Sequence, residues 1–177
     1  MSNTPTMNVS PVPFLAVFGP IGEMVERDWK YRAALDAAAA RAKPLLIVGG
    51  PYGGGRLRQM LRLSAHPAGD VCVDLHPEAC AGNNYVPGDI RQLPFSHKQF
   101  GAVFCSHVLE HMRSPDDAAQ AWRELNRVAD EVFICVPTKW DLYAWLHPDH
   151  FLWVWQVDQD IEVEDRATGV HYRYAGQ

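Results

Sequence analysis

A run of apolar residues that passes directly into a cluster of glycines constrains the fold of this chain most. Residues 45–48 read Leu-Leu-Ile-Val, and five of the seven residues from Gly49 to Gly55 are glycine. A short, wholly apolar run is typical of a strand that is covered on both faces. Glycines let the backbone turn sharply or come close to a ligand. The leucine-rich residues 55–65 are then expected to form a helix.

The same alternation of strand and helix continues along the chain. Further apolar runs predict strands at residues 71–75, 84–86, 102–106 and 132–136. A helix is predicted over residues 23–43, and another begins after Ser114, which is followed by a proline and two aspartates. Strands that alternate with helices predict a parallel sheet with helices on both faces.

The C-terminal residues follow a different pattern. Residues 151–157 alternate between apolar and polar side chains, and residues 162–164 and 171–174 can also be extended. Turn-forming residues separate these segments. They predict an antiparallel element on the edge of the parallel sheet.

Composition limits the classes of protein that the chain can belong to. The 177 residues are 47% hydrophobic and 21% charged, which predicts a single globular domain over residues 23–177. A net charge of −5 argues against a nucleic acid as the main partner. Residues 1–22 are expected to be an N-terminal arm or lid. Their apolar part is broken by prolines and is too short to span a membrane. We expect four reduced, buried cysteines and a cytoplasmic protein.

The glycine cluster lies where ligands bind in open α/β sheets, at the carboxyl end of a strand. Gly50 and Gly55 have the spacing of a phosphate-binding loop, but Arg56 follows where a lysine is needed. The dinucleotide fingerprint G-x-G-x-x-G is not present. A nucleoside without a bridging phosphate fits better, because Asp74 follows Gly53 by 21 residues and such an acid can hold ribose hydroxyls. A tight turn that binds no ligand is the other alternative.

Residues 88–112, GDIRQLPFSHKQFGAVFCSHVLEHM, weaken the alternative without a ligand. This segment resembles class I S-adenosylmethionine-dependent methyltransferases of the small-molecule type, which carry D-x-x-x-L-P-F and F-D-x-V-x-x-x-x-x-L-E-H. The matching positions are Asp89, residues 93–95, Phe100, Val103 and residues 109–111. The resemblance implies an α/β fold, a Rossmann-like three-layer sandwich with a mainly parallel sheet and an antiparallel C-terminal edge. It also implies S-adenosylmethionine as cofactor and a small-molecule substrate with an oxygen or nitrogen acceptor.

The resemblance also implies a set of site residues. They are Gly49, Gly50 and Gly53 at the methionine part of the cofactor, Asp74 and Leu75 at the ribose, Asp89 and Ile90 at the adenine, and Ser106 at the sulfonium. His107 and His111 are the candidate catalytic residues, because a histidine can take a proton near neutral pH. No metal ligand is assigned, and whether a metal ion binds near Glu110 stays open.

Other interpretations compete with a small-molecule methyltransferase. Ile47, Pro51 and Gly101 replace an acid, a glycine and an aspartate that are usual in the family, which favours a non-catalytic binding or regulatory domain on the same fold. His107 to His111 also spell H-x-x-E-H, the zinc-peptidase motif, which needs its histidines on one helix face. The tryptophans at positions 140, 145, 153 and 155 fit an apolar substrate pocket, a homodimer contact or ordinary core.

Overall fold

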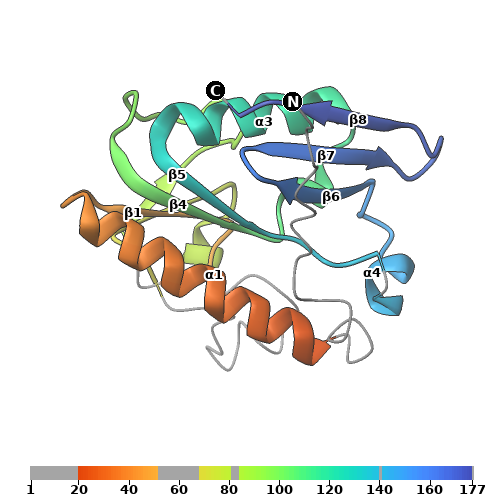
Figure 1. The fold of residues 1–177 in the computed structure, drawn as a ribbon, viewed down its shortest axis with the longest axis horizontal. Coiled ribbons are helices and arrows are strands. Elements are labelled where there is room, and N and C mark those ends of the chain that lie inside the picture. Colours follow the sequence, from red (N-terminus) through yellow and green to blue (C-terminus); the bar gives the residue numbers. More distant parts are fainter. Residues whose placement is uncertain (1–19, 52–67, 81–83, 140, 177) are drawn as a thin grey trace, which may run out of the picture.

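A five-stranded parallel sheet forms the centre of the molecule, seen in a computed structural model that describes residues 20–51, 68–80, 84–139 and 141–176 (Figure 1). Its strands lie in the order β3-β2-β1-β4-β5. They are β1 (Leu45–Val48), β2 (Val71–Asp74), β3 (Tyr85–Pro87), β4 (Phe100–Ser106) and β5 (Ala129–Cys135). Every pairing between neighbours is parallel, as the alternation of strand and helix predicted.

The two faces of this sheet are covered by different helices. Along β1, Leu45 and Ile47 join a core cluster with helix α1 (Pro20–Ala40), while Leu46 and Val48 join a cluster with helix α3 (Pro115–Val128). Side chains alternate between faces because successive residues of a strand point in opposite directions. The α/β prediction of helices on both faces is therefore confirmed.

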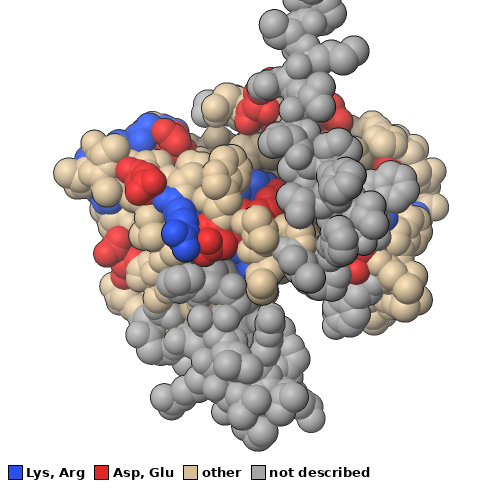
Figure 2. All heavy atoms as spheres, turned by 60° about the horizontal axis from the view of Figure 1, so that its bottom comes forward, with Lys and Arg blue, Asp and Glu red and all other residues tan. Residues whose placement is uncertain are grey.

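Helix α1 carries ion pairs between residues four positions apart. Lys30 pairs with Glu26 and Arg32 pairs with Asp28. Figure 2 shows acidic and basic side chains next to one another on the face of the molecule that carries this helix. The exposed Arg32–Asp28 pair contributes only a few tenths of a kcal/mol, whereas Lys30 is partly buried and also donates to the Ile134 carbonyl. Among the described residues, the charge of this face is therefore mixed.

The C-terminal strands are antiparallel, as predicted, but their predicted place is wrong. Strands β6 (Leu152–Val157), β7 (Asp160–Asp165) and β8 (His171–Tyr174) form a separate three-stranded sheet instead of an edge of the main sheet. The apolar side chains of β6 and β7 belong to the same core cluster as the buried face of α3, and the small sheet lies beside that helix (Figure 1). Packing against α3 buries this apolar face, which edge pairing alone would leave in water.

The predicted boundaries differ from the observed ones by a few residues. Helix α1 begins at Pro20, so residues 20–22 of the predicted arm are helical, while residues 1–19 and the predicted helix at 55–65 lie outside the described residues. Sequence patterns missed three short elements, the 3-10 helices η2 (Pro77–Cys80) and η3 (Leu109–His111) and helix α4 (Leu142–Leu146). No helix in the described ranges is long and apolar enough to cross a membrane.

The prediction of four reduced cysteines is wrong for two of them. Cys72 in β2 and Cys80 in η2 form a disulfide, because η2 folds back against the strand and brings the two residues together. Cys105 and Cys135 are free and buried, as expected. The bond therefore ties η2 to the strand that ends at Asp74.

The start of α3 gives a direct test of the sequence-based interpretation. The Ser114 side chain accepts a hydrogen bond from the Asp117 backbone N–H at 3.2 Å, and Pro115 occupies the first turn. Replacing Ser114 with alanine leaves that N–H without its partner and should lower the free energy of unfolding by about 1 kcal/mol. Urea denaturation measures the difference. Ser96→Ala, in the exposed loop before β4, is the control and should change stability by less than about 0.5 kcal/mol.

Candidate functional site

A cavity of about 960 Å³ lies at the carboxyl ends of the central strands. All but one of the predicted site residues line it, from four separate parts of the sheet: Gly49, Gly50, Asp74, Leu75, Asp89, Ile90, Ser106, His107 and His111. Gly53 lies outside the described residues. The fold thus brings together residues whose proximity was expected from the positions of the strand ends.

The glycines at the end of β1 are held closely by neighbouring backbone. Gly49 has a φ of 77°, and a Cβ atom there would lie 2.3 Å from Cγ2 of Val108 and 2.6 Å from the Ser106 carbonyl oxygen. At Gly50 a Cβ atom would lie 2.1 Å from the Ala79 carbonyl oxygen. Only glycine fits either position. The wall of the cavity at this point is therefore bare backbone.

Asp74 connects this loop to the end of β2. Its Oδ2 accepts the Gly50 backbone N–H at 3.0 Å, and its Oδ1 accepts the His76 backbone N–H at 2.8 Å. A carboxylate has about four acceptor positions, so Asp74 can still accept from hydroxyl groups in the cavity. Leu75, the next residue, is 67% exposed.

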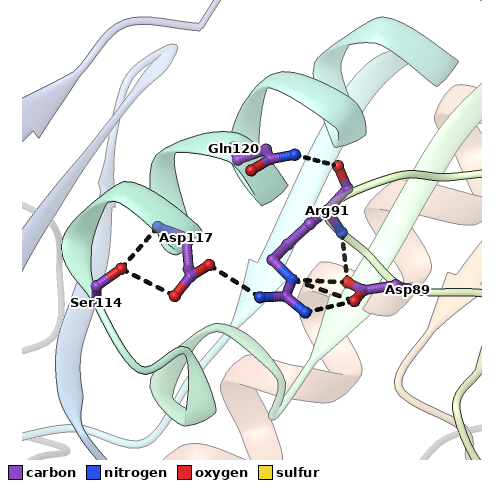
Figure 3. Close-up of polar contacts among 5 residues, drawn as sticks. All are labelled: Asp89, Arg91, Ser114, Asp117 and Gln120. Carbon is purple, nitrogen blue, oxygen red and sulfur yellow. Dashed lines mark hydrogen bonds and ion pairs between the residues drawn. The ribbon is translucent and has the colours of Figure 1, made fainter.

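Asp89 is held by an arginine from the same loop. Arg91 donates to the Asp89 carboxylate from Nη2 at 2.6 Å and to Asp117 on α3 from Nη1 at 2.9 Å (Figure 3). Its hydrogen bonds lower the pKa of Asp89 and the pKa of Asp117. Ile90, between the two charged residues, is buried. The cavity therefore has an ionised carboxylate beside an apolar side chain.

His107 follows β4 in an unusual conformation. Its φ is 55°, in a region of backbone conformation that residues other than glycine seldom adopt. Its Nε2 lies 2.9 Å from Oε1 of Glu23, and its Nδ1 lies 3.3 Å from Oε1 of Glu110. Burial lowers the pKa of His107, but hydrogen bonds with Cys135, Glu110 and Glu23 raise it further, to about 12. His107 is therefore a cation at neutral pH and has no lone pair with which to accept a proton.

His111 lies among two further histidines from the segment before β6. Its ring meets the rings of His147 and His150 edge-on, and these two stack on each other with centroids 4.4 Å apart. Nδ1 of His111 lies 2.9 Å from the Asp149 carbonyl oxygen. A carbonyl only accepts, so Nδ1 carries a proton, and Nε2 is the nitrogen with the lone pair in the neutral imidazole.

The zinc-peptidase arrangement is not formed. It requires two histidines on one helix face, but His107 follows a strand with a positive φ, and η3 covers only residues 109–111. The residue grouped with Glu110 and His111 is His150. The H-x-x-E-H spacing therefore arises here from a strand end and a short 3-10 helix.

Two lining residues on α1 were missed by the sequence analysis. Glu23 and Arg27 face the cavity, with Arg27 only 7% exposed, and their charged atoms lie 3.8 Å apart. In the sequence they look like any ion pair on a helix surface, so no local signal marks them. Ile47, which stands where the family usually has an acid, is fully buried in the core cluster with α1.

Comparison with known families fits this geometry. Residues 50–131 match the family model described as a methyltransferase domain. This segment is a class I methyltransferase domain. The family inferred from residues 88–112 is confirmed, and with it S-adenosylmethionine as the cofactor. The match favours an S-adenosylmethionine-dependent enzyme over the non-catalytic alternative. No curated protein sequence gives a significant match.

Solved structures that resemble this chain share little of its sequence. The PH0226 protein from Pyrococcus horikoshii is 17% identical, with 83% of this chain and 77% of that one covered and a TM-score of 0.41. An S-adenosylmethionine-dependent methyltransferase from Clostridium acetobutylicum is 12% identical, with coverages of 82% and 71% and a TM-score of 0.44. An amino pentose methyltransferase from Micromonospora echinaspora is 17% identical, with coverages of 85% and 75% and a TM-score of 0.40.

The close fit at Gly49 can be separated from its backbone conformation. Gly169, in the turn before β8, has a similar φ of 71°, but a Cβ atom there would meet nothing within 4 Å. Gly169→Ala should therefore cost only the backbone strain, about 1–2 kcal/mol. Gly49→Ala adds the clash with Ser106 and Val108 and should destabilise the protein by clearly more. Urea denaturation of both variants tests this, and equal losses would contradict the close fit.

The pairing of Arg91 with Asp89 and Asp117 predicts a pH dependence. Both carboxyl pKa values are lowered in the folded state. The stabilisation that the two ion pairs give is therefore fully present above the unfolded pKa of about 3.9 and is lost as the pH falls through the folded pKa values. In Arg91→Ala the unfolding free energy should fall less steeply between about pH 5 and 2.5. Gln120→Ala removes an uncharged hydrogen bond to the Arg91 carbonyl and should keep the wild-type slope. Identical slopes for all three proteins would refute the assignment.

Proposed function

We propose that this protein transfers the methyl group of S-adenosylmethionine to an oxygen or nitrogen atom of a small molecule. The observation that supports this most is the composition of the cavity. Bare glycine backbone, two carboxylates and a histidine cluster meet at the carboxyl ends of the parallel strands. The first two groups suit the cofactor, and the histidines suit an acceptor.

The residues on the cofactor side match the chemical groups of S-adenosylmethionine. Asp74 has acceptor positions left for the ribose hydroxyls, and Asp89 beside Ile90 suits an adenine with an amino group and an apolar ring face. Glu23 and Arg27 offer opposite charges near the glycine loop, which suits the ammonium and carboxylate of the methionine part. When bound, the cofactor supplies an electrophilic methyl group.

The chain itself has to orient the acceptor and remove its proton. Methyl transfer needs little covalent help, so alignment and exclusion of water are the main contributions of the protein. His107 is charged and lies between Glu23 and Glu110, so we assign it a positioning role for these carboxylates. His111 has an unprotonated Nε2 and lines the cavity, so it provides the lone pair at the acceptor end.

The small size of the acceptor is inferred from what surrounds it. His147, His150 and Ala144 line the same cavity as His111, so the segment between β5 and β6 forms one wall of the acceptor end. A concave site of this kind suits a small molecule better than a large polymer. Incubation with methyl-labelled cofactor and a panel of small phenols and amines should label at least one of them. Cofactor binding without transfer to any member would favour the non-catalytic alternative.

Asp74 provides the sharpest test of the cofactor assignment. Asp74→Asn removes the carboxylate that would accept hydrogen bonds from the ribose hydroxyls. It should weaken S-adenosylmethionine binding at least tenfold, since hydrogen bonds to charged groups contribute about 1.5–3 kcal/mol. Asp70, at the opposite end of the same strand, also accepts a backbone N–H, that of Leu45 at 2.8 Å. Asp70→Asn is therefore the matched control and should leave the affinity unchanged. Calorimetric titration measures both, and equal affinities would place the ribose elsewhere.

A further inference from the structure

We propose that Glu110, His111 and His150 bind a divalent transition-metal ion, with Zn²⁺ as the best match. Each residue offers one ligand atom, and these atoms all lie within 4.8 Å of one another. Glu110 and His111 come from η3, while His150 comes from the segment that leads into β6. The site itself does not depend on the proposed methyl transfer.

Glu110 is the first reason to expect a cation. Its side chain is only 1% exposed, and Oε2 accepts no hydrogen bond within the described part of the chain, while Oε1 has only the long contact with His107. The cation His107 lies 3.3 Å from one of these oxygens. A buried carboxylate is stable only when it is paired or coordinates a metal, and this one has bonding capacity left on both oxygens. The Glu110 carbonyl accepts the Phe151 N–H at 2.8 Å, which fixes η3 beside the segment that carries His150.

The two histidines are prepared for coordination in different ways. His111 donates from Nδ1 to the Asp149 carbonyl, which leaves Nε2 as the ligand atom. A metal-binding histidine typically makes such a hydrogen bond through its other nitrogen. His150 is 9% exposed, and its buried Nδ1 has no hydrogen-bond partner among the described residues. A bound cation would satisfy this nitrogen and the Glu110 carboxylate together.

The ligand types favour zinc. Two imidazole nitrogens and one carboxylate oxygen are a common set of zinc ligands. Ions such as Mg²⁺, which prefer oxygen ligands, seldom bind to imidazole. Ligands at about 2.1 Å from one ion are at most about 4.2 Å apart, so small side-chain rotations must close the widest permitted gap of 4.8 Å. His107 is then a hydrogen-bond partner of the ligand Glu110 and not itself a ligand, which separates this site from the H-x-x-E-H arrangement.

Three protein ligands leave an open coordination position. His111 and His150 both line the cavity, so that position would face its acceptor end. The bound metal would take up the lone pair of His111 Nε2 and would replace this nitrogen in the proposed function, by holding an acceptor oxygen or nitrogen in its deprotonated form. Only this use of the metal rests on the proposed function. Metal binding can therefore be measured without cofactor or acceptor, and it can succeed where methyl transfer fails.

The test uses the full chain, freed of metal with a chelator and titrated with Zn²⁺ and, separately, with Co²⁺ as a spectroscopic probe. We expect one equivalent of Zn²⁺ to bind and to raise the melting temperature. His111→Ala and His150→Ala should each weaken binding about a hundredfold or more, because the loss of outer partners alone costs 10- to 100-fold. His97→Ala, which changes an exposed histidine before β4, at the opposite end of that strand from Glu110 and His111, should bind like the wild type.

Two results would overturn the proposal. One is wild-type protein that binds no Zn²⁺ under these conditions, and the other is unchanged affinity in both histidine variants. If the variants do not fold, the visible spectrum of Co²⁺ in the wild-type protein decides. Intense bands indicate a four-coordinate site with protein ligands, whereas a weak spectrum like that of the hydrated ion excludes the site.

Discussion

The two central strands are buried on both faces, and the rest of the structure depends on this constraint. All four residues of β1 and all seven of β4 are buried, so their backbone groups must be satisfied within the sheet. β1 does so by pairing with β2 on one side and β4 on the other, both parallel. Parallel pairing aligns the carboxyl ends of the strands at one edge. The cavity therefore lies where the ends of β1, β2, β3 and β4 come together.

Charges at that edge must be compensated because water reaches them only partly. Asp89 is held by Arg91, Glu23 lies near Arg27 and His107, and Asp74 accepts two backbone N–H groups. These contacts keep the carboxylates in place without neutralising all of their bonding capacity. Glu110 differs from the others because it is the most deeply buried, and its Oε2 accepts no hydrogen bond in the described chain. The other acids are therefore suited to bind the cofactor, whereas Glu110 is suited to bind a cation.

The site is assembled from segments that are distant in the sequence. Helix α1 supplies Glu23 and Arg27, and the segment between β5 and β6 supplies His147 and His150. Ile47, on the same face of the sheet as α1, supplies no charge. The small antiparallel sheet helps to fix this segment, because β6 begins immediately after His150 and packs beside α3. An element that pattern analysis assigns to the sheet edge thus helps to hold the cavity wall in place.

Local chemistry in the sequence determined the parallel sheet, the start of α3 at Ser114 and the placement of the glycine loop beside Asp74. Each depends on neighbouring residues or on strand order, both of which can be read along the chain. Tertiary structure alone decided the separate sheet, the Cys72–Cys80 disulfide and the grouping of His150 with Glu110. The physical reason is that these contacts follow from how apolar faces are buried between elements. A periodic pattern identifies such a face but not the surface that covers it.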